Sequence, residues 1–273
     1  MKVSVILSTY NAPEWLEKVL WGYEVQTSKD FELVIADDGS DSPTFDLLKK
    51  FRTLSTLDLK HVWHEDTGFQ KSAILNKAIV ASSGDYLIFS DGDCIPRKDF
   101  VATHVRHADR GKFISGGYFM LPMETSKLIS KEDIINGNVF NVGWLKSHGL
   151  PSTYKTMKLS AKGRWQKFLN SVTPTKPTWN GHNSSGWKAD ILSVNGFNEQ
   201  MQYGGQDREL GERLVNAGVR GIQLRYSAVC VHLDHKRGYK TVESIAKNRR
   251  IRKETRDRKK TWTEYGIVKE GRP

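Results

Sequence analysis

Two carboxylates, Asp91 and Asp93, stand one residue apart directly after the apolar run YLIFS at 86–90. If that run is a buried strand, side chains two positions apart point to the same side, so both carboxylates face one ligand. Gly92 between them lets a ligand approach the backbone closely. Hard oxygen ligands of this kind suit Mg²⁺ or Mn²⁺, with substrate phosphates and water in the other positions. The pattern predicts a metal and diphosphate site, and the alternative is a solvated turn.

Polar residues follow two earlier apolar runs in the same way. Asp37 and Asp38 come after the run FELVIA, and an acid at the end of a strand can accept hydrogen bonds from a base or a ribose hydroxyl. We expect Asp37 to contact the nucleotide while Asp38 or Ser40 serves the turn, although an Asp-Gly turn alone would also explain the pair. The predicted nucleotide contacts are Ser8, Thr9, Asn11, Asp37, Asp38, Lys71, Asp91 and Gly92.

Neither of the common glycine-rich phosphate loops is present. Ser8-Thr9-Tyr10-Asn11 stands where Gly-x-Gly-x-x-Gly would follow the first strand, and no Gly-x-x-x-x-Gly-Lys-Ser/Thr occurs. This excludes dinucleotide oxidoreductases and P-loop NTPases. A diphosphate neutralised by a metal, with Lys71 reaching toward it, fits the residues better.

Alternating strands and helices must position these residues. Buried strands are expected at 2–8, 31–36, 59–64 and 86–90, with helices after Pro13, after Pro43 and over 70–81. This order predicts an α/β fold with a mostly parallel sheet, in which ligands bind beyond the carboxyl ends of the strands. The stretch 123–178 has weak periodicity and is interpreted as an insertion that shapes an acceptor site. A helix at 207–217 and a strand-like run at 221–231 follow.

The composition indicates a globular chain of 273 residues with an ample core. Its two cysteines, Cys94 and Cys230, form neither a disulfide framework nor a zinc spacing, so we expect a reducing cytoplasmic setting. The first apolar run is too short for a signal peptide, and no run is long enough to span a membrane.

Most of the net charge of +11 lies near the C-terminus. The segment that begins at Lys236 and ends at Lys260 has twelve Lys/Arg and three Asp/Glu, a net charge of 12 − 3 = +9, so the body is close to neutral. We expect a basic tail at 236–273, with a helix anchored by Val242, Ile245 and Ile251. Its predicted partner is an anionic membrane surface. The alternatives are a solvated helix that packs on the body and, least of all, nucleic acid.

The segments SVILSTYN, ELVIADDGS, GFQKSAILNKAI and YLIFSDGDC together resemble the nucleotide-binding half of family 2 glycosyltransferases with the GT-A fold. The resemblance implies a nucleotide-sugar-binding half at 1–122 and an acceptor-side half at 123–235 of the same domain. It places Thr9 and Asp37 near the base, Asp91 near the ribose and metal, and Asp93 on the metal. Lys71 stands where the family often has Arg.

The segment 181–218 is similar to the acceptor-side module of galactosyltransferase-like and chondroitin-polymerase-like enzymes. Their Gly-Gly-Glu-Asp step into a helix reads Gly204-Gly205-Gln206-Asp207 here, so a neutral amide replaces the first acid. A carboxylate at a helix N-terminus is well placed to take the proton of an attacking acceptor hydroxyl, and we assign this catalytic role to Asp207. The competing explanation is that Asp207 only complements the helix dipole.

In resembling enzymes a histidine after the strand at 221–231 completes the metal site. Imidazole is a frequent ligand of transition metals, and we favour His232 over His235 as that ligand. The alternative is a surface or core histidine. Trp179, Trp187 and Tyr203 flank the Gly-rich stretches, and aromatic rings can stack on sugars. Packing in the protein core would explain these three residues equally well. The predicted sugar and acceptor contacts are Asn183, Trp187, Tyr203, Gly205 and Gln206.

These observations predict an inverting glycosyltransferase that uses Mn²⁺ or Mg²⁺ and a nucleoside-diphosphate sugar, with UDP preferred by resemblance. The acceptor would be a hydroxyl of a saccharide or glycolipid, and family analogy suggests bacterial surface polysaccharide or lipopolysaccharide synthesis. We expect the protein in the cytoplasm or on the inner face of the plasma membrane. The rival functions are a sugar-nucleotide nucleotidyltransferase and a catalytically inactive sugar-nucleotide-binding module.

Overall fold

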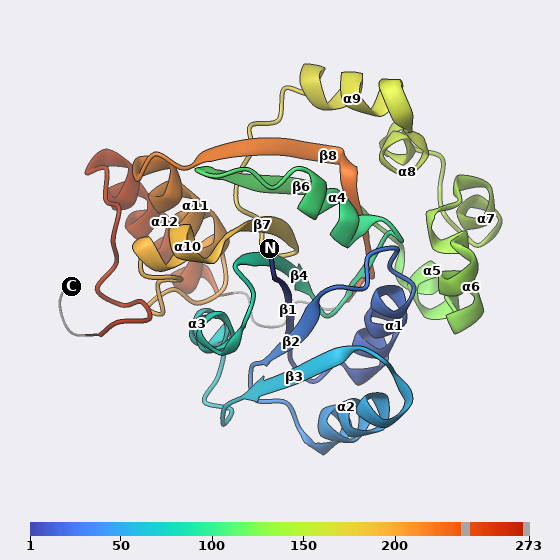
Figure 1. Ribbon diagram of the computed structural model, residues 1–273, viewed down its shortest axis with the longest axis horizontal. Helices are drawn as coiled ribbons and strands as arrows, with labels where there is room; N and C mark the ends of the chain where they lie inside the picture. Colours follow the sequence, from blue (N-terminus) through green and yellow to red (C-terminus); the bar gives the residue numbers. More distant parts are fainter. Residues whose placement is uncertain (236–240, 270–273) are drawn as a thin grey trace.

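The computed structural model describes residues 1–235 and 241–269. Within them, eight strands form one sheet in the order β3-β2-β1-β4-β7-β6-β8-β5 (Figure 1). The strands are β1 (Val3–Thr9), β2 (Glu32–Asp37), β3 (Asp58–Trp63), β4 (Tyr86–Asp91), β5 (Cys94–Pro96), β6 (Lys112–Met120), β7 (Asn183–Trp187) and β8 (Arg220–His232). β1 to β4 run parallel, as do β6 and β8, whereas β7 is antiparallel to β4 and β6 and β5 is antiparallel to β8. The predicted, mostly parallel α/β sheet is confirmed.

Helices lie on both faces of this sheet and beyond β8 (Figure 1). The α-helices are α1 (Pro13–Glu24), α2 (Ser42–Leu54), α3 (Lys71–Ala81), α4 (Phe100–Arg106), α5 (Met123–Leu128), α6 (Lys131–Asn136), α7 (Val142–Ser147), α8 (Met157–Ser160), α9 (Gly163–Val172), α10 (Lys188–Ser193), α11 (Gln206–Asn216) and α12 (Val242–Asp257). Two short 3₁₀ helices lie at Asn138–Phe140 and Tyr154–Thr156.

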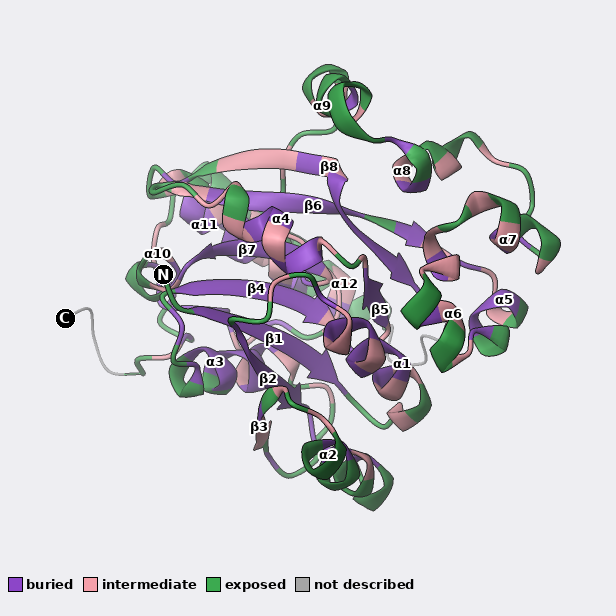
Figure 2. Ribbon diagram, turned by 45° about the vertical axis from the view of Figure 1, so that its right-hand side comes forward, coloured by how far each residue is buried: buried purple, intermediate pink, exposed green. Residues whose placement is uncertain are grey.

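The alternation of side chains along the strands creates two cores, one on each face of the sheet. Leu7 of β1 packs in the cluster that contains Leu20 of α1, while its neighbour Ile6 packs in the cluster that contains Ile74 of α3 and Leu210 of α11. All seven residues of β1 are buried, and Figure 2 shows the same for the central strands. Such strands carry continuous apolar runs, which is why the first, second and fourth were predicted within one residue.

β7 was not predicted as a strand because its sequence NSSGW has few of the residues typical of strands. It nevertheless pairs with β4 and β6 in the middle of the sheet, and all five residues are buried. Ser185 Oγ bonds to His104 Nδ1 (2.7 Å) and to the Tyr86 hydroxyl (2.7 Å), which satisfies its polar atoms. At Gly186 a Cβ would lie 3.2 Å from the Trp179 ring, so the close packing there favours the absence of a side chain.

The described part of the basic C-terminal segment packs on the body of the domain. Asn248 Nδ2 of α12 donates to the Gln202 carbonyl (2.8 Å), and Thr255 Oγ1 donates to Glu209 of α11 (3.0 Å). Val242, predicted as an apolar anchor, is instead 85 % exposed. Residues 236–240, which belong to the same predicted helix, lie outside the described residues. Among the helices described, none combines the length and apolar character needed to cross a bilayer.

Candidate active site

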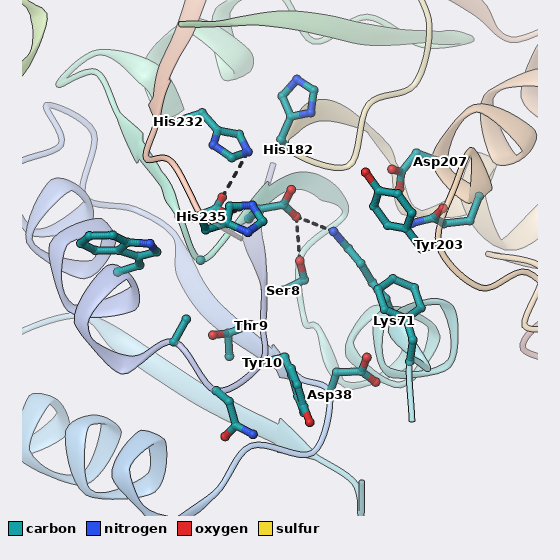
Figure 3. Close-up of a pocket in the computed structure, with 18 of the residues that line it drawn as sticks. Ser8, Thr9, Tyr10, Asp38, Lys71, His182, Tyr203, Asp207, His232 and His235 are labelled. Carbon is teal, nitrogen blue, oxygen red and sulfur yellow. Dashed lines mark hydrogen bonds and ion pairs between the residues drawn. The ribbon is translucent and has the colours of Figure 1, made fainter. Parts of the chain in front are cut away.

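A cleft of about 910 Å³ opens where the parallel strands β1 and β4 end, as the sequence predicts for ligand binding. Its walls come from these strand ends, the loop before α3 and the N-terminus of α11, together with the ends of β6 and β8. The lining residues include Ser8, Thr9, Asn11, Asp38, Lys71, Asp91, Gly92, Asp93, Tyr118, His182, Tyr203, Gln206, Asp207, His232 and His235. Figure 3 shows Asp207 on one side of the cleft, His232 and His235 on the other, and Lys71 between them.

Asp91 is fixed in place by two donors. Ser8 Oγ (2.7 Å) and Lys71 Nζ (2.6 Å) both donate to Asp91 Oδ1, and the Gly92 N–H donates to the Ser8 carbonyl (2.7 Å). Burial alone would raise the pKa of Asp91, but the charge of Lys71 and these hydrogen bonds hold it well below its ordinary value. Conversely, burial would lower the pKa of Lys71, and the charges of Asp91, Asp207 and Asp93 raise it above its ordinary value. Both side chains are therefore charged at neutral pH.

Asp93 and two histidines offer a set of ligands for a cation. Asp93 Oδ1 lies 3.7 Å from His232 Nε2, and Asp93 Oδ2 lies 3.1 Å from His235 Nε2. His232 Nδ1 donates to the Leu233 carbonyl (2.7 Å), which leaves Nε2 with its lone pair toward the cleft. A carboxylate oxygen suits Mn²⁺, and imidazole nitrogens beside it are frequent ligands of transition metals. Cys94 also lies within reach of Asp93 and His232, but it is fully buried. Burial raises the pKa of its thiol, so Cys94 remains a thiol and a poor ligand.

The charge of the cleft also fits a divalent cation. Among the described residues that line it, four are acidic (Asp38, Asp91, Asp93 and Asp207) and one is basic (Lys71), a formal balance of 1 − 4 = −3 with neutral histidines. A diphosphate would be repelled by such a surface unless a cation lay between them. The residues present therefore fit the metal that the sequence predicts.

Asp207, the predicted base, is in the cleft with a free oxygen. It occupies the first turn of α11, and its Oδ1 is buried without a hydrogen-bond partner among the described residues. Burial raises the pKa of this carboxyl, although the charge of Lys71 opposes the shift. A raised pKa makes the carboxylate a better proton acceptor.

His182 lines the cleft but was not singled out from the sequence. Its ring lies 4.5 Å from that of Tyr118, and its carbonyl accepts a hydrogen bond from Ser90 Oγ (3.1 Å), which fixes it beside the end of β4. Burial lowers the pKa of His182 to about 4, against the attraction of Asp91, so the ring is neutral at physiological pH. The only signal in the sequence is its place beside the Gly-rich segment that precedes β7.

The predicted division of work between Asp37 and Asp38 is reversed. Asp37 is fully buried below the cleft, where its oxygens accept from the Ser40 N–H (2.9 Å) and pair with His61 Nε2 (2.8 Å). Asp37 therefore serves the turn. Asp38 lines the cleft and is held by His64 Nε2 (2.8 Å) and the Gln70 N–H (3.0 Å). Burial raises the pKa of Asp38.

Only part of the predicted sugar and acceptor set reaches the cleft. Tyr203 and Gln206 line it, whereas Gly205 lies outside the lining, with a φ of +101° at the start of α11. Asn183 is fully buried and its Nδ2 donates to the carbonyls of Gly117 (2.7 Å) and Ala228 (3.0 Å), so it joins β6, β7 and β8. Its prediction as a sugar contact was wrong.

Trp187 was also wrongly predicted as a sugar contact, because it lies at the opposite end of β7 from the cleft. Trp187 pairs with Tyr86 at the start of β4, and its Nε1 donates to the Asp109 carbonyl (2.9 Å). The stretch 123–178 likewise supplies none of the residues that line the cleft among those described. The role of this stretch in shaping an acceptor site stays a prediction.

Two features define the GT-A class of nucleotide-sugar-dependent glycosyltransferases. One is the parallel strand β4, which leads into the acidic pair Asp91 and Asp93, and the other is Asp207 in the facing wall of the cleft. The chain belongs to glycosyl transferase family 2, whose family model matches residues 4–161. The predicted resemblance is thus confirmed.

The relatives extend the match into the second half of the chain. An uncharacterized glycosyltransferase of Bacillus subtilis, YfnE, is 27 % identical over 91 % of this chain and 69 % of its own length. A validoxylamine A glucosyltransferase of Streptomyces hygroscopicus is 26 % identical over 80 % of the chain and 52 % of its length. The chondroitin synthase of Escherichia coli is 25 % identical over 79 % of the chain but only 32 % of its length. The chain thus spans between 32 % and 69 % of the length of these relatives.

Solved structures share the fold. The mannosyltransferase PcManGT of Pyrobaculum calidifontis, in complex with GDP-Man and Mn²⁺, matches 87 % of this chain and 58 % of its own with a TM-score of 0.57 and 22 % identity. TarS of S. aureus, residues 1–349 with UDP-GlcNAc, matches 92 % of this chain and 65 % of its own with a TM-score of 0.61 and 18 % identity. These identities support the GT-A fold alone.

Proposed function

We propose that this enzyme transfers a sugar, with inversion, from a nucleoside-diphosphate donor to a hydroxyl group, and that it requires Mn²⁺ or Mg²⁺. One observation carries the proposal: Asp207, which has an oxygen without a hydrogen-bond partner among the described residues, faces the acidic pair across one cleft. Lys71 and the histidines lie beside the acidic pair. In this arrangement the diphosphate lies toward Asp91 and Asp93, and the acceptor approaches from Asp207.

Asp91, Asp93, His232 and His235 would hold the cation, which would neutralise the diphosphate and stabilise it as a leaving group. Lys71 supplies a further positive charge where the leaving oxygen develops its negative charge. Asp207 accepts the proton of the acceptor hydroxyl while the oxygen of that hydroxyl forms the bond to the anomeric carbon. The bond from that carbon to the diphosphate oxygen breaks at the same time, and its electron pair leaves with the diphosphate.

The donor is proposed to be a UDP-sugar. TarS was solved with UDP-GlcNAc, and PcManGT with GDP-Man, so both bases occur on this fold. The test is donor hydrolysis with a panel of UDP-, GDP- and TDP-sugars, with and without Mn²⁺. We expect Mn²⁺-dependent release of UDP. Release that persists undiminished in EDTA would reject the role of the metal. Release of GDP alone would reject uracil as the base of the donor nucleotide.

The acceptor is proposed to be a saccharide or a glycolipid of a bacterial surface polysaccharide or lipopolysaccharide. The similarity to chondroitin synthase, whose product is a polysaccharide, supports this class of acceptor. Tyr203 and Gln206, which line the cleft beside Asp207, are the proposed acceptor contacts. Incubation of the donor with bacterial lipid and polysaccharide extracts, followed by mass spectrometry, would identify the product.

A further inference from the structure

Helix α9 exposes an ordered apolar face. Trp165, Phe168 and Val172 are 54 %, 51 % and 54 % exposed, and their spacing of three and four residues places them on one side of the helix. The rings of Trp165 and Phe168 are stacked, with centroids 5.3 Å apart and planes at 22°. In Figures 1 and 2, α9 lies at the outer margin of the domain, beyond β8.

The other side of α9 is fastened to the sheet. Leu169 is buried, and Gln166 Nε2 donates to the Tyr226 carbonyl (2.8 Å). Asn170 accepts from the Tyr226 N–H (3.0 Å) and donates to Ser227 Oγ (2.7 Å), both on β8. Because these contacts fix the rotation of the helix, its apolar side chains point outward.

The segment that carries this face is rich in positive charge. The stretch 150–176 contains six Lys/Arg and no Asp or Glu: Lys155, Lys158, Lys162, Arg164, Lys167 and Lys176. Among the described residues, none of these six forms an ion pair with a carboxylate. The near-neutral sum for the body therefore hides a basic surface that adjoins exposed aromatic rings.

The more basic helix α12 lacks the exposed apolar face, and some of its positive charge is paired. Arg252 and Arg256 pair with Glu212 of α11, and Lys253 pairs with Asp257, so part of its charge is matched within the protein. Its most exposed apolar residue, Val242, stands at the first position of the helix, while α9 presents three such residues together.

We propose that the α9 face, defined as Trp165, Phe168, Val172 and the five basic residues of 150–176 other than Lys158, docks on a lipid bilayer with anionic headgroups. Aromatic rings of this kind lie at the boundary between headgroups and acyl chains, while Lys and Arg side chains reach the phosphates. The face is close to the active site, because Lys158 Nζ donates to the carbonyl of Tyr118 (2.9 Å), a residue that lines the cleft. This proposal does not depend on the identity of the donor, on the metal or on Asp207 as the catalytic base.

Vesicle flotation of the whole chain tests the proposal, with phosphatidylcholine vesicles compared with vesicles that also contain phosphatidylglycerol. We expect binding to the anionic vesicles only, reduced at high salt. The double variant Trp165→Ala/Phe168→Ala should bind about tenfold more weakly or worse. The double variant Lys162→Glu/Lys167→Glu should lose about twentyfold or more. All four side chains are exposed, so the variants should keep the wild-type melting temperature and nucleotide affinity.

The matched control is Lys247→Glu/Arg250→Glu, which reverses two exposed charges on α12 and should retain most of the binding. Loss in this control with normal binding by the α9 variants would overturn the proposal in favour of the C-terminal helix. Equal binding to neutral vesicles would overturn the electrostatic part. Absence of vesicle binding, with self-association in sedimentation velocity that Trp165→Ala/Phe168→Ala abolishes, would show that a second copy occupies the face instead.

Discussion

Replacement of Asp207 by Asn tests the assignment of the base with the smallest change in shape. The amide has the size of the carboxylate but cannot accept the proton of the acceptor. The other carboxylates that line the described cleft are all engaged. Asp91 is bound by Lys71 and Ser8. Asp38 is held by His64 and the Gln70 N–H, and Asp93 lies beside two histidines. General-base catalysis contributes about 10²–10⁴-fold, and we expect a loss in the upper half of that range, about 10³–10⁴-fold in turnover.

Nucleotide affinity and thermal stability should not fall with turnover in Asp207→Asn. The carboxylate attracts Lys71, so its removal leaves the lysine freer for the diphosphate, and nucleotide affinity should be unchanged or tighter. Burial raises the pKa of Asp207 above the ordinary 3.8, which means that folding disfavours its ionised form. This cost is present above the raised pKa and absent below the unfolded value. Asp207→Asn should therefore raise the melting temperature at pH 7 and have little effect below about pH 3.8.

The assay is release of nucleoside diphosphate from donor by water or acceptor, with calorimetry of nucleotide binding and thermal melts on the same samples. Asp190→Asn is the matched control, because the pKa of Asp190 is also raised by burial and one of its oxygens also lacks a partner among the described residues. It lies on α10, outside the lining of the cleft, and its variant should turn over normally. Turnover by Asp207→Asn within tenfold of wild type would refute the assignment of the base.

Four further results are expected. Gly181→Ala would place a Cβ 2.7 Å from Asp207 Oδ1, and this displacement of the base should lower kcat by about 10²-fold while a melt shows little change. In a pH profile of kcat/KM, activity should fall as pH drops through the raised pKa of Asp207, so the acidic limb should lie above 3.8; a limb at or below that value would contradict the reasoning. His232→Ala should weaken Mn²⁺-dependent nucleotide binding in calorimetry by about tenfold or more, and His235→Ala should weaken it less; the reverse order would make His235 the more important of the two ligands. Asn183→Ala leaves three buried hydrogen bonds unmade, so urea denaturation should show a loss of about 2–4 kcal/mol while nucleotide affinity is kept; a stable variant with weak sugar binding would restore Asn183 to the site.

The sequence predicted those parts of the cleft that depend on short segments. Asp91, Gly92 and Asp93 follow a strand whose apolar run is unmistakable, and the position at the end of a parallel strand fixes which edge of the sheet they occupy. Lys71 and Asp207 stand at helix starts that the same periodicity located. Local pattern was sufficient at these positions because the neighbours along the chain determine where the side chain points.

The tertiary structure decided the contacts between segments that are distant in the sequence. Asn183 and Trp187 lie in a strand of small polar residues, and only its pairing with β4 and β6 shows that one is a core amide and the other lies at the far end of the sheet. The exchange between Asp37 and Asp38 depends on His61 and His64, which β3 and the residue after it bring beside β2. Periodicity reveals that a side chain is buried but not which partners surround it, because those partners come from strands and helices whose order in the sheet differs from their order in the chain.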